Sequence, residues 1–281
     1  MLLGAHVSSQ GGVAEAPQRG GALRATAIQL FTKTPNQWRE RTVSEETAAQ
    51  FRDEVARHEL EAVVAHDSYL INLASPDPLL RERSMESFCA ELERSSALGL
   101  QAVVSHPGNY IDDREAGLER NAAAYAVCLA RVPSALEVWI EGTAGSGTAL
   151  GARFEELRDL RDALPDEIRT RVGFCLDTAH LHAAGYDLAR IEEVWEEFDR
   201  IVGFALLKCL HLNDSRAAAG SRVDRHEWIG EGRIGAEPFR RIMRDTALSG
   251  VVKIIETPKR DDPLRHDRRM LRRLRAYARK N

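Results

Sequence analysis

One stretch of the sequence concentrates side chains that can bind metal ions. His211 closes the apolar run 203–210, and Asp224 and His226 follow it on a predicted loop, two residues apart. At this spacing a carboxylate and an imidazole can reach the same ion, but they do not complete a metal site. We therefore expect further ligands from other parts of the chain.

The rest of the chain has the pattern of a barrel that could bring such ligands together. Eight apolar runs alternate with segments of helical periodicity, which is typical of parallel strands joined by helices. Strands are predicted at 2–7, 27–32, 61–66, 101–106, 136–141, 172–177, 206–212 and 251–256, and helices at 11–23, 44–58, 79–98, 114–131, 151–164, 188–199, 236–246 and 263–279. Eight such units in residues 1–281 predict an α/β fold, a single-domain (β/α)8 TIM barrel, and a doubly wound sheet is the alternative.

Seven of the eight predicted strands end in a group that can bind a metal or move a proton. These groups are His6, His66, His106, Glu141, Asp177, His211 and Glu256. In a TIM barrel the carboxyl ends of all strands meet at one mouth, where active sites lie. We therefore predict one site at the C-terminal mouth.

A cation would reconcile so many ionisable groups at one mouth, because unpaired buried charges cost several kcal/mol. Nitrogen and carboxylate ligands without thiolate favour zinc, manganese or iron over magnesium or calcium. His180 lies three residues after Asp177 and could join Asp224 and His226 if the loop coils. We expect His6 to support a ligand and His182 to be structural.

The overall charge argues against a protein that coats nucleic acid. The chain carries 39 basic and 43 acidic residues, a net charge of −4, whereas backbone binding depends on lysine and arginine. The most basic segment extends from Arg265 to Lys280, with Leu264, Leu271 and Leu274 at helical spacing. This pattern favours the solvated face of a helix over a nucleic-acid patch.

The cysteines indicate a reducing compartment. Cys89, Cys128, Cys175 and Cys209 are scattered and form no C-x-x-C pair, so we predict neither a disulfide framework nor a thiolate zinc site. The first residues lack the features of a signal peptide, and no apolar run approaches the length of a membrane span. A soluble, cytoplasmic protein without a membrane partner is expected.

Loops after the second and third predicted strands carry basic, amide and aromatic groups. Lys33, Gln37 and Trp38 follow the second strand, and Tyr69 and Leu70 follow the third. Aromatic and apolar side chains at a barrel mouth can stack on a nucleic acid or wedge into it. Packing between loops is the alternative for Trp38 and Tyr69.

Taken in order, these motifs resemble those of the endonuclease IV family of apurinic/apyrimidinic endonucleases. The resemblance extends over nearly the whole chain. The matching stretches are 4–8 (GAHVS), 31–33 (FTK), 66–73 (HDSYLINL), 106–108 (HPG), 141–145 (EGTAG), 177–180 (DTAH), 211–215 (HLNDS), 220–226 (GSRVDRH) and 256–259 (ETPK).

The resemblance implies a site for three Zn²⁺ ions. It assigns His66, His106 and Glu141 to one ion, Glu141, Asp177, His211 and Glu256 to the second, and His180, Asp224 and His226 to the third. Glu141 is implied to be the bridging catalytic ligand that positions a hydroxide. His6 stays outside the ligand set.

The activity implied by the resemblance is hydrolysis of the phosphodiester 5′ of abasic sites in DNA, in base-excision repair. Trimming of blocked 3′ ends is implied as well. The expected partner is double-stranded DNA that contains abasic sites, and we expect a monomer. Two ions that share a carboxylate can activate water and neutralise phosphate charge, which suits this chemistry.

The resemblance also implies residues that contact DNA. Tyr69 and Leu70 would fill the gap left by the missing base, because extruding a sugar costs least where no base is stacked. Asn36 stands where better-known members carry an inserting arginine, and Gly142 and Ser146 replace an asparagine and a glutamine. The remaining candidates for DNA contacts are Lys33, Gln37, Arg222 and Arg225, with Arg216 as a candidate for the backbone.

Two other classes of function stay open from the sequence. A metal-dependent sugar isomerase or epimerase would use a similar barrel mouth, but it would leave Asp224 and His226 without a role. A nucleic-acid-binding module with purely structural metals is the other. Metal content and cleavage of an abasic duplex distinguish these classes.

Overall fold

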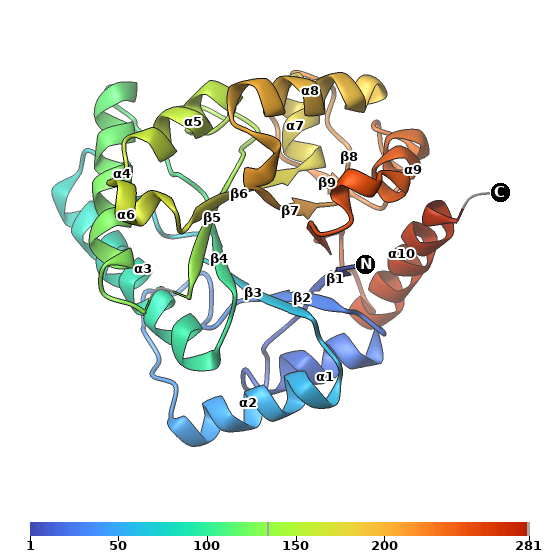
Figure 1. The fold of residues 1–281 in the computed structure, drawn as a ribbon, viewed down its shortest axis with the longest axis horizontal. Helices are drawn as coiled ribbons and strands as arrows, with labels where there is room; N and C mark the ends of the chain where they lie inside the picture. The colour runs from blue at the N-terminus through green and yellow to red at the C-terminus, as the bar shows by residue number, and fades with distance from the viewer. Residues whose placement is uncertain (134, 280–281) are drawn as a thin grey trace.

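A computed structural model describes residues 1–133 and 135–279, and Lys280 of the basic segment lies outside them. Eight parallel strands form a closed barrel in the order β1-β10-β7-β6-β5-β4-β3-β2 (Figure 1). Their bounds are β1 Leu3–His6, β2 Ala27–Leu30, β3 Ala62–His66, β4 Ala102–Ser105, β5 Glu137–Glu141, β6 Val172–Asp177, β7 Leu207–His211 and β10 Val252–Ile255. The predicted TIM barrel is confirmed, and each predicted strand is present.

Helices surround the barrel where the periodicity predicted them (Figure 1). They are α1 Glu15–Ala22, α2 Glu45–Arg57, α3 Pro78–Leu98, α4 Arg114–Leu129, α5 Phe154–Asp162, α8 Ile191–Ile201, α9 Ala236–Arg244 and α10 Pro263–Ala278. Local signals set the ends of α3: Asp77 accepts hydrogen bonds from the main-chain amides of Leu79 and Leu80, and Gly99 ends the helix in the left-handed region.

Several short elements were not predicted. They are α6 Asp166–Arg169, α7 Thr178–Ala184, the 3-10 turns η2 Phe204–Leu206 and η3 Thr246–Leu248, and the antiparallel pair β8 Asp214–Ser215 and β9 His226–Glu227, whereas the 3-10 turn η1 Leu188–Arg190 lies within the helix predicted at 188–199. All are too short to give a clear periodic pattern. Two of them, α7 and β9, carry side chains of the predicted site.

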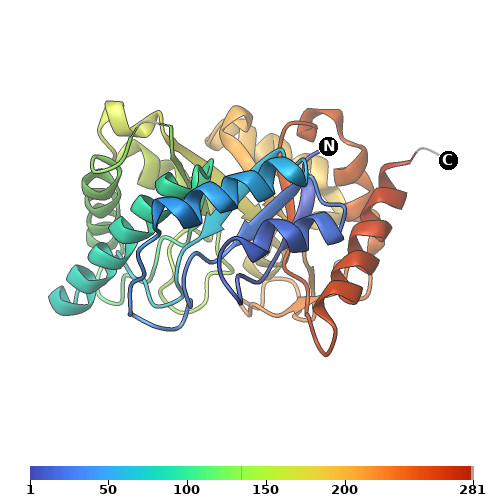
Figure 2. The same ribbon diagram turned by 90° about the horizontal axis from the view of Figure 1, so that it is seen from below.

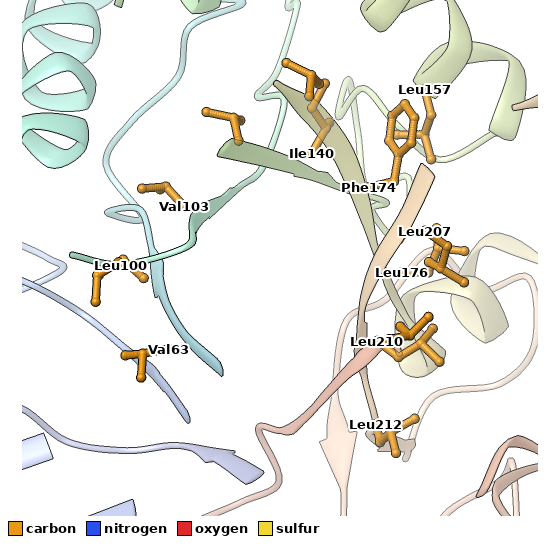
Figure 3. Close-up of a cluster of buried hydrophobic side chains, with 14 of the residues drawn as sticks. Val63, Leu100, Val103, Ile140, Leu157, Phe174, Leu176, Leu207, Leu210 and Leu212 are labelled. Atoms are coloured by element: carbon orange, nitrogen blue, oxygen red, sulfur yellow. The ribbon is translucent and has the colours of Figure 1, made fainter. Parts of the chain in front are cut away.

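Alternation along the strands separates two apolar layers. Outward-facing residues such as Val63, Leu176 and Leu210 pack in the large cluster between the barrel and the helices (Figure 3). Their neighbours Val64, Cys175 and Cys209 belong to a second cluster in the barrel interior. Because side chains alternate with a period of two, the residue two positions after each interior residue also points inward, one layer nearer the mouth.

The prediction that the cysteines are unpaired is wrong for two of them. Cys89 on α3 and Cys128 on α4 form a disulfide, with their Cα atoms 4.8 Å apart. Packing of these neighbouring helices brings the two side chains together across 39 residues of sequence, a pairing that motif spacing does not reveal. Cys175 and Cys209 are free and buried.

None of the helices in the described residues combines the length and apolar character that crossing a membrane requires.

Candidate metal centre

Strand alternation brings the strand-end groups together at the mouth of the barrel. Glu141, Asp177 and His211 end their strands two residues after the interior residues Trp139, Cys175 and Cys209. His66 ends β3, and His106 and Glu256 directly follow β4 and β10, each also two residues after an interior residue. The same geometric rule therefore directs all six side chains into one space.

The loop after β6 coils into α7, as the predicted role of His180 requires. The Asp177 side chain caps this helix, because its Oδ1 accepts hydrogen bonds from the main-chain amides of Ala179 and His180 at 2.6 and 3.1 Å. Its other oxygen, Oδ2, faces the site and lies 3.5 Å from His226 Nε2. One carboxylate thus positions His180 and contributes to the cluster itself.

His226 reaches the mouth from the small β8–β9 pair. The buried Asp214 carboxylate organises the turn after β9, where it accepts hydrogen bonds from the amides of Gly230, Gly232 and Ile234 at 2.9–3.0 Å. Asp224 lies on the exposed loop before β9, with its oxygens 3.3 Å from His180 Nε2 and 3.2 Å from His226 Nε2. The structure therefore brings Asp224 to the two imidazoles it was predicted to join.

Potential ligand atoms within 4.8 Å of one another form three overlapping groups at the mouth. They are His66, His106 and Glu141; Glu141, Asp177, His211 and Glu256; and Asp177, His180 and His226. Glu141 is shared by the first two groups and Asp177 by the last two. The first two groups are those expected from the sequence, whereas the third contains Asp177, with Asp224 in contact at its edge.

The imidazoles are held so that one ring nitrogen of each faces the cluster. In four of them the other nitrogen lies 2.9–3.3 Å from an oxygen acceptor outside the cluster. His66 lies against the main-chain oxygen of Asp67, and His180 against that of Gly142. The acceptor for His226 is the main-chain oxygen of Glu256, and the acceptor for His211 is the side-chain oxygen of Gln29. Acceptors of this kind fix the orientation of metal-binding histidines.

Opposite charges dominate the electrostatics of the cluster. Burial alone would lower the pKa of His66, but the hydrogen bond and charge of Glu141 raise it to about 9. Burial lowers the pKa of His106 to about 4, since this ring gains less from its neighbours. For Glu141, burial would raise the pKa, and the charges of His211 and His106 hold it well below its usual range. Ionised carboxylates are therefore available to a cation that replaces the imidazole protons.

These residues fit divalent metal ions. Nε2 of His226 is buried and has no hydrogen-bond partner among the described residues, although two carboxylates lie within 3.5 Å. A ring nitrogen that faces carboxylates without a hydrogen bond is suited to coordinate a cation shared with them. Imidazole nitrogens with carboxylate oxygens form a donor set typical of zinc.

Two buried amides that the sequence analysis missed support the cluster. The Gln29 side chain accepts a hydrogen bond from His211 Nε2 at 2.9 Å and donates to Glu256 Oε1 at 2.7 Å. Asn213 donates to Asp177 Oδ2 at 2.6 Å and accepts from the amide of Glu256 at 2.8 Å. A single polar residue in the apolar run 27–30 was the available signal for Gln29.

The position of His6 agrees with a supporting role. Its Nδ1 lies 2.9 Å from Glu256 Oε1 and 3.0 Å from the Gln29 amide nitrogen. His6, Gln29 and Glu256 therefore form one hydrogen-bonded group beside the second set of potential ligands. His6 is absent from the ligand groups found among the described residues.

Replacing Gln29 by leucine is expected to weaken metal binding by about 10- to 100-fold, the usual effect of losing a side chain that orients a ligand. His211 and Glu256 would each lose a partner, while a side chain of similar size would preserve the packing. Titration with a zinc buffer measures the affinity, and the thermal unfolding of the metal-loaded protein is the control for folding. Unchanged zinc affinity would contradict the positioning role of Gln29.

Two free thiols lie beneath the cluster, on its interior side. The sulfurs of Cys175 and Cys209 are within 4.8 Å of each other and of a ring nitrogen of His211. Motif spacing could not reveal this group, because its members come from different strands, β6 and β7. The thiols below the carboxylates therefore favour softer metal ions than the imidazole and carboxylate ligands that face the mouth.

The cluster opens into a cavity of about 410 Å³. Tyr69, Phe31 and Lys259 line this cavity together with the candidate ligands. The Tyr69 ring packs edge-on against Phe31 with centroids 5.2 Å apart, yet the residue is 69% exposed. Leu70 is half-buried beside it. The aromatic tip therefore projects beside the cavity, where it can contact a bound molecule.

The loop after β2 is anchored by a buried network of charges. Lys33 is buried, and its ammonium donates to Glu40 Oε1 at 2.6 Å and Ser87 Oγ at 3.0 Å. Arg94 on α3 bonds both Glu40 and Thr32. Lys33 therefore holds the loop in place and does not present its charge to the mouth.

Other side chains of this loop remain accessible. Asn36 and Gln37 are exposed. Trp38 is half-buried, with the Arg83 guanidinium 4.6 Å from the centre of its ring. Trp38 therefore packs within the protein, as the alternative to a nucleic-acid contact predicted, whereas the side-chain amides of Asn36 and Gln37 are accessible to a ligand.

The arginines of the loop between β8 and β9 differ in their surroundings. Arg222 and Arg225 are exposed, and the Arg222 carbonyl accepts a hydrogen bond from Ser146. Arg216 pairs with Glu227 at 2.7 Å. Arg222 and Arg225 are therefore better placed than Arg216 to contact phosphates.

Comparisons with known proteins agree with this geometry. The family described as "Xylose isomerase-like TIM barrel" matches residues 21–274. A "Probable endonuclease 4" of Geotalea daltonii is 44% identical over 267 residues, covering 92% of both chains. That of Chloroflexus aurantiacus is 45% identical over 280 residues, covering 98% of this chain and 97% of the relative.

Solved structures show the same relationship. Endonuclease IV from Thermus thermophilus superimposes with a TM-score of 0.87 at 37% identity, covering 99% of this chain and 98% of that chain. A D-tagatose 3-epimerase-like protein reaches a TM-score of 0.71 at 18% identity, covering 99% and 98%, a likeness that shows the fold alone. The chain therefore belongs to the endonuclease IV family of the xylose isomerase-like TIM barrels.

Proposed function

We propose that this protein is a zinc-dependent endonuclease that hydrolyses the phosphodiester 5′ of abasic sites in double-stranded DNA. Membership of the endonuclease IV family makes it a phosphodiester hydrolase that cleaves DNA. The observation that carries the finer proposal is the set of three overlapping ligand groups at one mouth, joined through Glu141 and Asp177. Base-excision repair is the process that such an activity serves, and trimming of blocked 3′ ends belongs to the same proposal.

Three zinc ions are proposed to occupy these groups. His66, His106 and Glu141 would hold one ion, and Glu141 would share a second with Asp177, His211 and Glu256. His180, Asp224 and His226 would hold the third, with Asp177 oriented between the second and third groups by its bond from Asn213. When bound, such ions lower the pKa of water and neutralise charge on a phosphate.

The chain's own residues contribute position and charge. Glu141 is 1% exposed, and its two oxygens lie 3.0 Å from His211 Nδ1 and 3.1 Å from His66 Nε2, so its carboxylate is fixed between two groups. Gln29 fixes His211 and Glu256, and Asn213 fixes Asp177. Pre-arranged charges of this kind stabilise a transition state without reorganisation during the reaction.

Phosphate approaches through the cavity beside Tyr69. Lys259, from the loop after β10, lines this cavity, and its ammonium bonds Asp267 at 2.7 Å. The bond holds the cation at the rim. Tyr69 and Leu70 are proposed to enter the gap of an abasic site, where no base stacking opposes insertion.

Elemental analysis paired with cleavage of a defined abasic duplex tests the proposal. We expect three zinc ions per chain and a single cut 5′ of the abasic site. One or two ions with turnover of a free sugar would support the isomerase or epimerase alternative. Three ions with DNA binding and no cleavage would support a binding module with structural metals. Either of these results would overturn the proposed activity.

Replacing Tyr69 by alanine is expected to reduce the preference for abasic over intact duplex by about 10- to 100-fold. The expected loss corresponds to about 1–3 kcal/mol, the value of an aromatic side chain that stacks on a nucleic acid. Metal content should be unchanged, because Tyr69 lies outside the ligand groups of the described residues. Competition binding measures the preference, and Tyr69→Phe is the matched control. Equal preference in the alanine variant and the wild type would exclude the insertion role.

A further inference from the structure

The helix α10 carries a charge opposite to that of the rest of the protein. Residues 263–279 contain seven arginines and one carboxylate, Asp267, whereas the remainder of the chain holds 32 basic and 42 acidic residues. In the described part of the chain, Asp267 is paired with Lys259, and Glu231 is the carboxylate that forms ion pairs with arginines of this helix. Most of the positive charge on α10 is therefore not neutralised by neighbouring carboxylates.

Several of these arginines have a structural role, but their bonds leave the charge in place. Arg268 and Arg275 donate to the main-chain oxygens of Ala22 and Arg24 at the end of α1. Burial lowers the pKa of Arg275, and the nearby positive charge of Arg24 lowers it further. The effect of Arg24 shows that positive charge is concentrated here. A carbonyl accepts a hydrogen bond without cancelling the charge of a guanidinium. The helix therefore presents a strongly positive surface.

Three of the arginines are exposed and lack a partner within residues 1–133 and 135–279. The side chains of Arg265, Arg272 and Arg279 form no hydrogen bond or ion pair with any residue that the structure describes, and all three are exposed. A groove of about 600 Å³ runs between α10 side chains, and its lining consists of five arginines and His266. Exposed charges in a basic groove have the character of a site for an anion.

The position of α10 connects this surface with the mouth of the barrel. Figure 2 shows the helix, in red, running from the loop after β10 along the outer wall. Lys259 of that loop lines the cavity of the candidate metal centre, and Arg260 follows it with its guanidinium 3.7 Å from the centre of the Trp228 ring. Lys259 and Arg260 therefore lie between the mouth and the arginines of the helix, from which Asp261 and Asp262 separate them in sequence.

We propose that α10 is a second binding surface for duplex DNA, which contacts the phosphate backbone regardless of sequence or damage. The distance from Arg265 to Arg279 corresponds to about 21 Å along a helix. A duplex carries one charge per about 1.7 Å, so about twelve phosphates lie within this length. Because α10 lies on the outer wall, it holds DNA outside the cleavage site and keeps the substrate near the mouth. The inference rests on the proposed function for its choice of DNA as the anion.

Salt-dependent binding of an undamaged duplex by the full-length, metal-loaded protein tests the inference. The test variant combines Arg265→Gln, Arg272→Gln and Arg279→Gln, which leaves every described structural bond of α10 intact. The control variant combines Arg57→Gln in α2, Arg131→Gln just after α4 and Arg158→Gln in α5, an equal change in charge. Figure 1 shows these three helices on other sides of the barrel from α10. Fluorescence anisotropy at several salt concentrations gives the affinity and its salt slope for each protein.

The test variant should bind more weakly at low salt, and its slope should fall by about two to three, since each lost phosphate contact removes about 0.9. The control should bind like the wild type. Equal losses in both variants would reveal an effect of net charge alone, and an unchanged slope in the test variant would exclude α10 as a DNA surface. Both results overturn the inference. Cleavage of a short abasic duplex by the test variant reports on the proposed function separately and should be unchanged.

Discussion

Replacing Glu141 by glutamine is expected to reduce cleavage of an abasic duplex by about 10³-fold. The carboxylate is shared by two ligand groups and lies within 3.5 Å of four imidazoles. The amide keeps the shape but removes the negative charge, so both groups bind cations less tightly. A loss of about 4 kcal/mol in the stabilisation of the transition state, a reasonable value for impaired metal catalysis, corresponds to this factor.

Single-turnover cleavage measures this effect, and elemental analysis shows how much metal remains. Glu137→Gln is the matched control, because Glu137 begins the same strand at the opposite end of the barrel, where it bonds the Trp139 indole. The control should cleave at the wild-type rate. If Glu141→Gln binds DNA with an affinity close to that of the wild type, the slower cleavage is an effect on catalysis and not on DNA binding. A rate within threefold of the wild type would be incompatible with the proposed role of Glu141.

Removing the metal ions with a chelator is expected to abolish cleavage and to lower the thermal unfolding temperature. Without cations, buried carboxylates and imidazoles balance each other only through protons, and the binding energy of the ions is lost from the folded state. A ligand at about 1,000 times its dissociation constant stabilises a protein by about 4 kcal/mol, so the loss of several ions should be large. Calorimetry and a cleavage assay on the same samples measure both effects.

Zinc added back to the stripped protein should restore both properties, whereas chelator saturated with zinc beforehand should change neither. Magnesium should restore less, because the site offers five imidazoles that magnesium binds poorly. Full activity after complete removal of metal, verified by elemental analysis, would refute the metal-dependent mechanism.

The barrel could be predicted from the sequence because its signals are local and repeated. Each strand appears as a short apolar run, and capping residues directly beside a helix, such as Asp77 and Gly99 at the ends of α3, indicate where it begins and ends. The strand-end ligands were accessible for the same reason, since one geometric rule applies to all strands. The resemblance to the endonuclease IV family then implied which residues bind which ion, and the spacing of the residues alone does not predict this assignment.

Interactions that depend on three-dimensional packing could not be predicted from the sequence. Gln29 was placed inside a strand predicted to reach residue 32, whereas β2 ends at Leu30 and Gln29 lies in the layer next to the mouth. Lys33 is a predicted DNA contact because it follows the second strand on a loop at the mouth, but Glu40 and Ser87 bind its ammonium and keep the side chain buried. The pairing of Cys89 with Cys128 depends on how α3 packs against α4.

The distribution of the ligands along the chain has a consequence for synthesis of the protein. The first group is complete in sequence at Glu141 and the third at His226, but the second group, which shares a residue with each of them, lacks Glu256 until the last strand has been made. Closing the barrel requires β10 to pair with both β1 and β7. A nascent chain therefore cannot assemble all three groups before this strand is made, and the proposed zinc ions can fill the complete centre only after that point.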